Sequence, residues 1–325
     1  MTVKITSDIS VTDIPALQYN DYSIYRKKVA PIISSNEYKR WILTDGVKAV
    51  VARSNKEIIG QMWAHPIKIF QNGVLLKQRF FWVHNIKVHP SWQNKGIFRQ
   101  IEEYYRKKLL SEEVHRFFLI ESKNTRMRLL ANKLKLFPGV NVSGAVLFRY
   151  FTFPRIKKPK PLEIVKSHTI PKLLRYHVKK HKKYWVPHFS WDTSPEWFSF
   201  YFRKQLICIL QVSRPIHPTQ GRFIHKFPIL LKTLQIRYLS IPFDEREVQP
   251  SITRSIFTTL FHTYPQINTL VFTLSPSLLS QFLGFPKFLF FLRKFILYST
   301  TNDPDLIQNN LDFHSSFILL NDDKG

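Results

Sequence analysis

The chain has 325 residues, of which 44% are hydrophobic and 15% aromatic, so it is long enough for two domains and apolar enough to bury a core in each. Its one cysteine, Cys208, excludes an internal disulfide, and the polar N-terminus lacks the apolar stretch of a secretory signal, so we expect a cytoplasmic protein. The net charge is +27, from 49 basic and 22 acidic residues, so the protein as a whole should attract polyanions and not repel them.

The basic excess is spread over both halves of the chain. Residues 1–150 contain 25 basic and 11 acidic residues, and residues 151–325 contain 24 and 11. A surface with this much positive charge would attract a phosphate-bearing cofactor, nucleic acid or an anionic membrane. A basic soluble surface without a polyanionic partner explains the charge excess equally well. The densest basic run, at 175–183, fits either a polyanion-binding patch or a solvated helix face or linker.

The first 73 residues predict strands and helices that lead into a central segment. A short strand at 3–5 precedes one or two helices at 13–28, where Pro15 suits a first helical turn. The apolar runs at 47–53 and 57–70 are typical of antiparallel strands joined by a tight turn. Gln71-Asn72-Gly73 is a strong hairpin signal.

The segment from Phe80 to Leu110 predicts a strand, a turn and a helix. Residues 81–88 are mostly apolar or β-branched and are followed by Pro90, which is typical of a buried strand. A helix is predicted from Ile97, because apolar residues then recur every three or four positions. Just before it, Gly96 follows a lysine, and a glycine beside free N–H groups at a helix N-terminus often binds phosphate.

Three more elements complete the first domain. We predict a strand at 116–120, a helix at 124–136 and the closing strands within 140–153. The order of the elements indicates an α+β fold with a mixed sheet.

The residues of the loop carry a resemblance to a known family. Gln93-Asn94-Lys95-Gly96-Ile97-Phe98 resembles the (Q/R)-x-x-G-x-(G/A) signature of the GNAT superfamily of acyl-CoA-dependent N-acetyltransferases, and Ile86-Lys87-Val88-His89-Pro90 is similar to its V-x-V-x-P strand end. The spacing matches neither the dinucleotide-binding motif nor the P-loop. The chain departs from the signature at Phe98, where the family has Gly or Ala.

The resemblance implies a fold in which two central strands splay apart, commonly at a bulge, and admit the pantetheine arm of acetyl-CoA. Ile86 and Val88 would then pair with pantetheine through backbone groups, and Asn124 would reach the pantetheine or the thiol end. The pyrophosphate would be held by Gln93, Asn94, Lys95, Gly96, Ile97 and Phe98. No Cys-x-x-Cys or His-rich cluster predicts a metal.

Acyl transfer to an amine needs a group that removes a proton from the nucleophile. The glutamate that some family members use corresponds to Trp82 here, so that base is missing. His84, on the same strand face, has a suitable ordinary pKa, and Glu121 at the end of the next strand is the second candidate. The alternatives are a packed strand histidine and a surface carboxylate.

The acid that reprotonates the leaving thiolate is also missing. The segment from Leu130 to Phe137 looks like the family's L-Y-x-K-x-G-F, with Ala131 in place of the tyrosine. Tyr104 and Tyr105 are expected in the core. Proximity and orientation would then have to supply most of the rate.

The second half of the chain repeats the order of the first. Residues 154–184 are basic and rich in Lys and Pro, which predicts a connector between domains at 1–153 and 185–325. The segment before Ile252 offers no glycine loop, so we predict a degenerate second GNAT-like domain that binds no CoA. Its predicted elements are strands at 205–212, 225–232, 233–240, 269–273 and 288–298, and helices at 252–264 and 277–283.

The most apolar stretch, 282–297, is interrupted by Pro286, Lys287, Arg293 and Lys294. It is too short and too charged to cross a bilayer, so we expect a buried edge strand, with a membrane-surface segment as the alternative.

Together these features predict a tandem GNAT-like protein that moves an acetyl group from acetyl-CoA to a primary amine. The amine could belong to a small molecule or a protein. The alternative is a non-catalytic protein of the same fold that uses its basic surface for nucleic acid or an anionic membrane.

Overall fold

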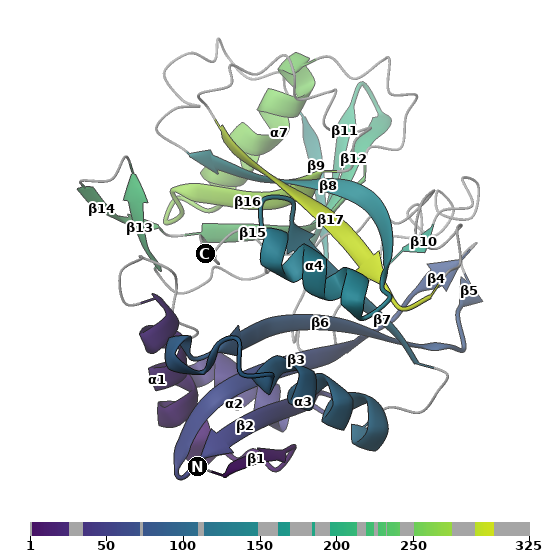
Figure 1. Cartoon of the computed structure of the whole chain (residues 1–325). Helices are drawn as coiled ribbons and strands as arrows, with labels where there is room; N and C mark the ends of the chain where they lie inside the picture. The colour runs from purple at the N-terminus through teal and green to yellow at the C-terminus, as the bar shows by residue number, and fades with distance from the viewer. Residues whose placement is uncertain are drawn as a thin grey trace.

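A computed structural model describes residues 2–25, 35–71, 74–109, 114–148, 162–169, 184–185, 196–212, 219–223, 227–231, 233–240, 250–274 and 290–301. A 12-stranded sheet runs through these parts of the chain, with helices on its faces (Figure 1). Its strands follow the order β1-β2-β3-β6-β7-β17-β8-β16-β15-β12-β11-β9. None of the described helices is long and apolar enough to cross a membrane.

Most elements of the first half match the sequence-based expectations, including antiparallel pairing of β4 with β5 on either side of the predicted hairpin turn, but the helix α2 (Ser35–Leu43) was not predicted. The predicted helix continuation to residue 28 lies outside the described residues. The elements are β1 (Val3–Thr6), η1 (Val11–Asp13), α1 (Ile14–Tyr25), α2 (Ser35–Leu43), β2 (Lys48–Ser54), β3 (Glu57–Ile67), β4 (Phe70–Gln71), β5 (Val74–Leu75), β6 (Arg79–Val88), η2 (Pro90–Trp92), α3 (Ile97–Tyr104), the π-helical turn η3 (Tyr105–Leu109), β7 (Val114–Glu121), α4 (Thr125–Lys133) and β8 (Phe137–Phe148).

Helices cover both faces of this half of the sheet. On one face, α3 and α4 pack on the strands through Ile97, Ile101 and Ala131. On the opposite face, α1 and α2 contribute Leu17 and Trp41 to a separate core. Each buried stripe follows helical spacing, which is why the apolar positions of the sequence predicted these helices. The strands between the two layers therefore present one face to each.

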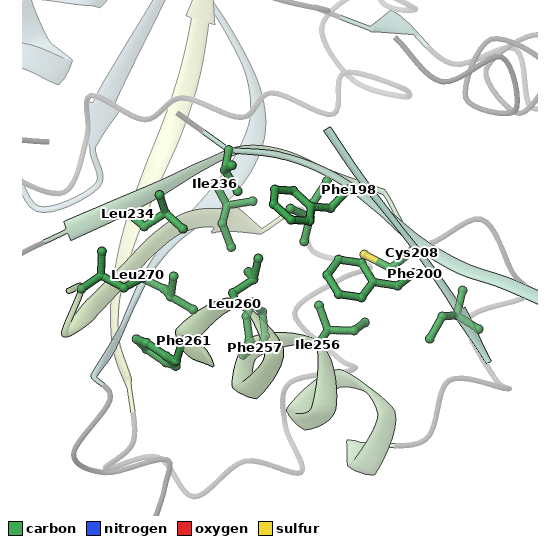
Figure 2. Close-up of a cluster of buried hydrophobic side chains, with 14 of the residues drawn as sticks. Phe198, Phe200, Cys208, Leu234, Ile236, Ile256, Phe257, Leu260, Phe261 and Leu270 are labelled. Atoms are coloured by element: carbon green, nitrogen blue, oxygen red, sulfur yellow. The ribbon is translucent and has the colours of Figure 1, made fainter. Parts of the chain in front are cut away.

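The second half adds a core of its own. Its apolar side chains lie between α7 and the strands β11, β12, β15 and β16, and Cys208 is buried among them (Figure 2). The predictions at 277–283 and in the connector at 154–161 and 170–183 lie outside the described residues, whereas residues 163–167 of the predicted connector form a strand of the sheet, paired with residues 197–201. The elements are β9 (Glu163–Ser167), β10 (Tyr184–Trp185), β11 (Glu196–Phe202), β12 (Gln205–Val212), β13 (Thr219–Phe223), β14 (Phe227–Leu231), β15 (Thr233–Ser240), α7 (Pro250–Thr263), β16 (Thr269–Leu274) and β17 (Phe290–Ser299).

The last described strand, β17, lies inside the sheet between β7 and β8. It pairs with β7 from Phe295 to Ser299 and with β8 from Phe290 to Ser299, while β8 pairs on its other side with β16 of the second half. The expectation of an edge strand was therefore wrong, because this apolar segment has hydrogen-bonded neighbours on both sides. The expectation of several closing strands within 140–153 was also wrong: the described part forms one strand, and its neighbour comes from the far end of the chain.

Candidate active site

The parallel strands β6 and β7 separate part of the way along their length. They pair from Arg79 with Val114 to Val83 with Phe118, and no later pair joins them. Beyond that point β7 pairs with β17 on its other side, up to Glu121 with Phe295. The strands therefore splay, as the resemblance implied, and we call the unpaired region between residues 84–88 and residues 119–121 the opening.

A bulge in β6 stands at the start of this opening. Asn85 has a left-handed backbone (φ 51°), and the register with β3 shifts between Gln61 and Trp63. The bulge changes which residues face α3: Phe81 and Val83 do so before it, and Ile86 and Val88 after it. Beyond the bulge β6 still pairs with β3 but no longer with β7, so the two residues predicted to pair with pantetheine, Ile86 and Val88, lie in the part of β6 that has no β7 partner.

The loop before α3 ends in a left-handed glycine at the helix N-terminus. Gly96 is the residue that precedes α3, with φ 75°, and a Cβ atom built on it would meet no other atom within 4 Å. The backbone conformation therefore favours glycine at this position, and the space above it is open. The first N–H groups of a helix have no acceptor within the helix. The N–H groups at the start of α3 are therefore candidates for binding a phosphate.

The side chains around the loop hold it against β6. The Gln93 amide donates a hydrogen bond to the Val88 carbonyl (3.2 Å), so pantetheine would compete with Gln93 for that acceptor. The Lys95 ammonium lies 4.9 Å from the centre of the Trp92 ring and is exposed. Phe98 packs against the α3 core, which explains how a large side chain fits where the family has Gly or Ala.

Asn124 lies just past the end of β7, on the other side of the opening. Its Oδ1 accepts a hydrogen bond from the Met127 N–H (3.1 Å) and caps α4. The residue thus has a structural role, and among the described residues no hydrogen bond of its Nδ2 donor is found.

The predicted base His84 lies among aromatic rings on the α1–α2 face. Its ring centre is 4.8 Å from that of Trp41 and 4.6 Å from that of His65. Burial, and to a smaller extent the charge of Lys87, together lower the pKa of His84 to about 3. The imidazole is therefore neutral at physiological pH but only weakly basic.

Glu121 flanks the other side of the opening and is half-buried at the end of β7. Phe118 and Ile120 face the α3 core, so alternation along the strand puts Glu121 on the same face as His84. Ala131, in the place of the family's tyrosine, is buried under α4, and Tyr105 is buried in the same core. Burial raises the pKa of Tyr105, while the Arg116 guanidinium lowers it and the Glu102 carboxylate raises it by smaller amounts. Buried in the core, Tyr105 does not take the place of the acid that is missing at Ala131.

Two buried polar groups near the opening were missed by sequence reasoning. The Tyr38 hydroxyl accepts hydrogen bonds from the Gln61 amide (3.1 Å) and the Asn85 amide (3.2 Å), which ties α2 to the bulge. Asn85 Oδ1 is buried without a donor among the described residues, so it can accept a hydrogen bond from a ligand. An asparagine inside a strand pattern was the available signal, because Asn readily adopts a left-handed backbone.

A second missed feature links α3 to β7. Arg116 and Glu102 form a buried ion pair with a distance of 2.6 Å, and the Arg116 guanidinium lies over the ring of Tyr105. Within the described residues, no group of three or more His, Cys, Asp or Glu side chains is arranged to hold a metal ion.

The splayed strands, the bulge and the glycine turn before α3 together define a GNAT acyltransferase fold. The sequence model of the acetyltransferase (GNAT) family matches residues 16–135, the segment that contains all of these features. This part of the chain belongs to that family.

Solved structures extend the likeness to nearly the whole chain. A tandem GNAT protein from the clavulanic acid biosynthesis pathway superposes with a TM-score of 0.55 at 9% identity, over 92% of this chain and 98% of that one. A GCN5-related N-acetyltransferase from Sphaerobacter thermophilus gives 0.53 at 11% identity, over 96% and 98%. N-myristoyltransferase from Saccharomyces cerevisiae gives 0.55 at 11% identity, over 91% and 79%. At these identities the likeness shows the tandem GNAT fold alone. No match was found among curated protein sequences.

Proposed function

We propose that the protein transfers an acetyl group from acetyl-CoA to a primary amine. The observation that carries the proposal is the open glycine turn before α3, directly beside the splayed ends of β6 and β7. The pyrophosphate of acetyl-CoA would bind the N–H groups from Asn94 to Phe98, and Gln93 and Lys95 would border it. Pantetheine would lie between the strands, next to Ile86, Val88 and Asn124.

The amine would approach from the α1–α2 face, where His84 and Glu121 flank the opening. Because the lowered pKa of His84 makes it a weak base, Glu121 or water would have to remove the proton from an ordinary alkylamine. An α-amino group, with an ordinary pKa near 8, would need less help than a lysine-type amine with a pKa of about 10.4. Proximity would supply much of the rate. The cytoplasm remains the proposed location.

A second candidate function is a non-catalytic protein of the same fold. The specific observations in its favour are Trp82 and Ala131 at the places of the usual glutamate and tyrosine, together with the weak basicity of His84. Such a protein could still bind acyl-CoA and would release no CoA thiol in the presence of an amine.

Replacement of Gly96 tests the site. Acetyl-CoA at a hundred times its dissociation constant should stabilise the wild-type protein by about 2.7 kcal/mol in a thermal or chemical unfolding measurement. The Gly96→Trp variant should lose this stabilisation, because the side chain fills the open space above the turn. Asn55→Trp is a matched control, since Asn55 also has a left-handed backbone (φ 56°) and is exposed in the turn between β2 and β3.

If Gly96→Trp kept the acetyl-CoA stabilisation, the assignment of the phosphate loop would be wrong. The choice between the two functions needs a different measurement. Release of free CoA thiol, followed with a library of amines, should occur with the wild-type protein and not with Gly96→Trp. Binding without thiol release from any amine would favour the non-catalytic protein.

A further inference from the structure

Gly60, in β3, lies directly against the first turns of α3. A Cβ atom built on Gly60 would stand 3.0 Å from Ile97 Cγ2 and 3.0 Å from Ile101 Cδ1. Carbon atoms of packed side chains normally lie about 3.5–4.0 Å apart. Ile97 is 2% exposed and Ile101 0%, and both belong to the core under α3. The missing side chain of Gly60 therefore lets α3 lie closer to β3 than alanine or any larger residue would allow.

The two isoleucines differ in how they could make room for a side chain at residue 60. Ile101 would meet it with Cδ1, the far end of its side chain, which can rotate away. Ile97 would meet it with Cγ2, a branch on Cβ, and a β-branched residue in a helix has one strongly preferred χ1 rotamer. The Cγ2 atom of Ile97 therefore moves away only together with the backbone of residue 97, which begins α3 directly after Gly96.

Gly60 also lies beside the start of the loop that leads to α3. In the ladder between β3 and β6 it is the partner of Val88, the last residue of β6. The next residue, His89, donates its N–H to the Ile59 carbonyl (2.8 Å). The loop thus leaves the sheet beside Gly60 and returns to the core against Gly60 at Ile97. This one position therefore sets the spacing between the two ends of the loop.

A side chain at residue 60 would press on the helix and not on the neighbouring strand. The third atom near the added Cβ is the Lys87 carbonyl oxygen at 3.4 Å, which is an ordinary van der Waals contact. The backbone of β6 would therefore stay in place. The residues of β6 proposed to lie next to pantetheine, Ile86 and Val88, should not move.

We propose that Gly60 is a positioning residue for the pyrophosphate of acetyl-CoA. By admitting Ile97, it holds the N–H groups of the glycine turn where the phosphate oxygens need them. The inference rests on the proposed function, which assigns the turn to the pyrophosphate. Hydrogen bonds to a charged oxygen are confined to about 2.7–2.9 Å. An alanine at residue 60 would displace Ile97 by a few tenths of an ångström and so weaken several of these bonds together.

Calorimetry of the full chain with two probes tests the inference. Acetyl-CoA carries the pyrophosphate, whereas S-acetylpantetheine carries the same thioester and amides without a phosphate. Gly60→Ala should raise the dissociation constant of acetyl-CoA roughly tenfold and leave that of S-acetylpantetheine within about twofold of the wild-type value. A residue that only stabilised the fold would affect both probes alike.

Removal of the two contacting atoms tests the mechanism. Valine at residue 101 lacks Cδ1 and leucine at residue 97 lacks Cγ2, so Ile101→Val with Ile97→Leu removes both atoms that a Cβ at residue 60 would meet. Adding Gly60→Ala to this pair should then change the dissociation constant of acetyl-CoA by less than about twofold. If Gly60→Ala alone does not fold, Gly60→Ala with Ile101→Val takes its place. Only the stiffer contact with Ile97 then remains, and the weakening of acetyl-CoA binding should persist.

Ile256→Val is the matched control for a general loss of stability. Ile256 is 1% exposed and belongs to the core of the second half, which α3 does not enter. The change removes one buried methyl group and should lower the unfolding temperature. It should leave the affinity for both probes unchanged.

Three results would overturn the inference. The first is wild-type affinity for acetyl-CoA in Gly60→Ala or in its double variant. The second is equal weakening of both probes, and the third is a weakening that Ile97→Leu with Ile101→Val does not relieve. Absence of acetyl-CoA binding by the wild-type protein is a different result, because it would contradict the proposed function and remove this inference with it.

Discussion

The imidazole of His84 is held neutral by its surroundings, and this has a consequence for stability. In the unfolded chain a histidine takes up a proton near its ordinary pKa of about 6.5, whereas in the folded protein the pKa of His84 is lowered to about 3. The unfolded state therefore binds more protons below pH 6.5. The free energy of unfolding is therefore not reduced by His84 above pH 6.5. Below that pH it should fall by up to roughly 1.4 kcal/mol per pH unit as the pH drops toward 3.

Urea unfolding at a series of pH values measures this effect. The His84→Phe variant keeps a ring and cannot take up a proton, so its stability should decrease less steeply between pH 6.5 and 4. His168→Phe serves as the control, because His168 is exposed and its replacement should leave the slope as in wild type. Equal slopes for His84→Phe and wild type would show that His84 is not the group held neutral.

Asn124 has one oxygen and one nitrogen with separable roles. Asn124→Ser keeps a side-chain acceptor for the Met127 N–H and should leave the free energy of unfolding nearly unchanged, whereas Asn124→Ala should lose about 1 kcal/mol. Both variants lack the amide donor, so both should bind acetyl-CoA more weakly by calorimetry. Unchanged affinity in the serine variant would restrict Asn124 to capping α4.

At the scale of elements, α3 is fixed to β7 by the buried pair Glu102 and Arg116. Glu102→Gln should cost roughly 3 kcal/mol of stability or more, because it leaves the guanidinium buried without a full counter-charge. Replacement of both residues by methionine should recover most of this loss. Chemical denaturation measures both values.

The exposed pair Arg99 and Glu103 on the same helix is a natural control. Their side chains are 81% and 41% exposed, so Glu103→Gln should change stability by less than about 1 kcal/mol. A similar cost for Glu102→Gln and Glu103→Gln would contradict the view that the inner pair holds α3, and with it the glycine turn, against the sheet.

At the scale of the whole molecule, β8 and β17 join the two halves into one sheet. Tyr298 of β17 belongs to the core under α3, and the Thr300 hydroxyl accepts a hydrogen bond from the Arg116 N–H (2.9 Å). The C-terminal half therefore supplies part of the support for the first half's opening. The proposed division at 1–153 and 185–325 describes the repeat in the sequence and not two independently paired sheets.

Truncation tests this dependence. A chain ending at residue 289 lacks β17 and should lose both cooperative unfolding and the acetyl-CoA stabilisation, because β7 and β8 are left with unpaired edges. A chain ending at Thr301 keeps β17 and should retain both, as measured by scanning calorimetry. Retention of the acetyl-CoA stabilisation by the shorter chain would show that the opening forms without the C-terminal strand.

Much of the fold could be predicted because its signals are local. The strand at 81–88, the helix start at Ile97 and the two long antiparallel strands before them follow from apolar spacing and turn residues, and the structure has each of them. Gly96 was identifiable because a helix N-terminus with a left-handed residue strongly favours glycine. The position of the candidate phosphate loop, directly before α3, was predictable for the same reason.

The character of His84 was not predictable in this way. Its type and strand position suggested a base, but Trp41 and His65 come from other elements, and their packing decides how strongly the proton is held. The ion pair of Glu102 with Arg116 was not predictable either. Helical periodicity puts Glu102 among the polar positions of α3, and it is buried only because Arg116 on the neighbouring strand pairs with it.

The sequence by itself determined the local elements, the glycine turn and the positive charge, because each depends on residues within a few positions of one another. The tertiary structure alone decided that the strand near the C-terminus lies between β7 and β8, because apolar content makes a segment a buried strand without choosing its neighbours. That choice depends on pairing between residues far apart in the chain, such as Glu121 with Phe295. The same long-range pairing leaves the opening between β6 and β7.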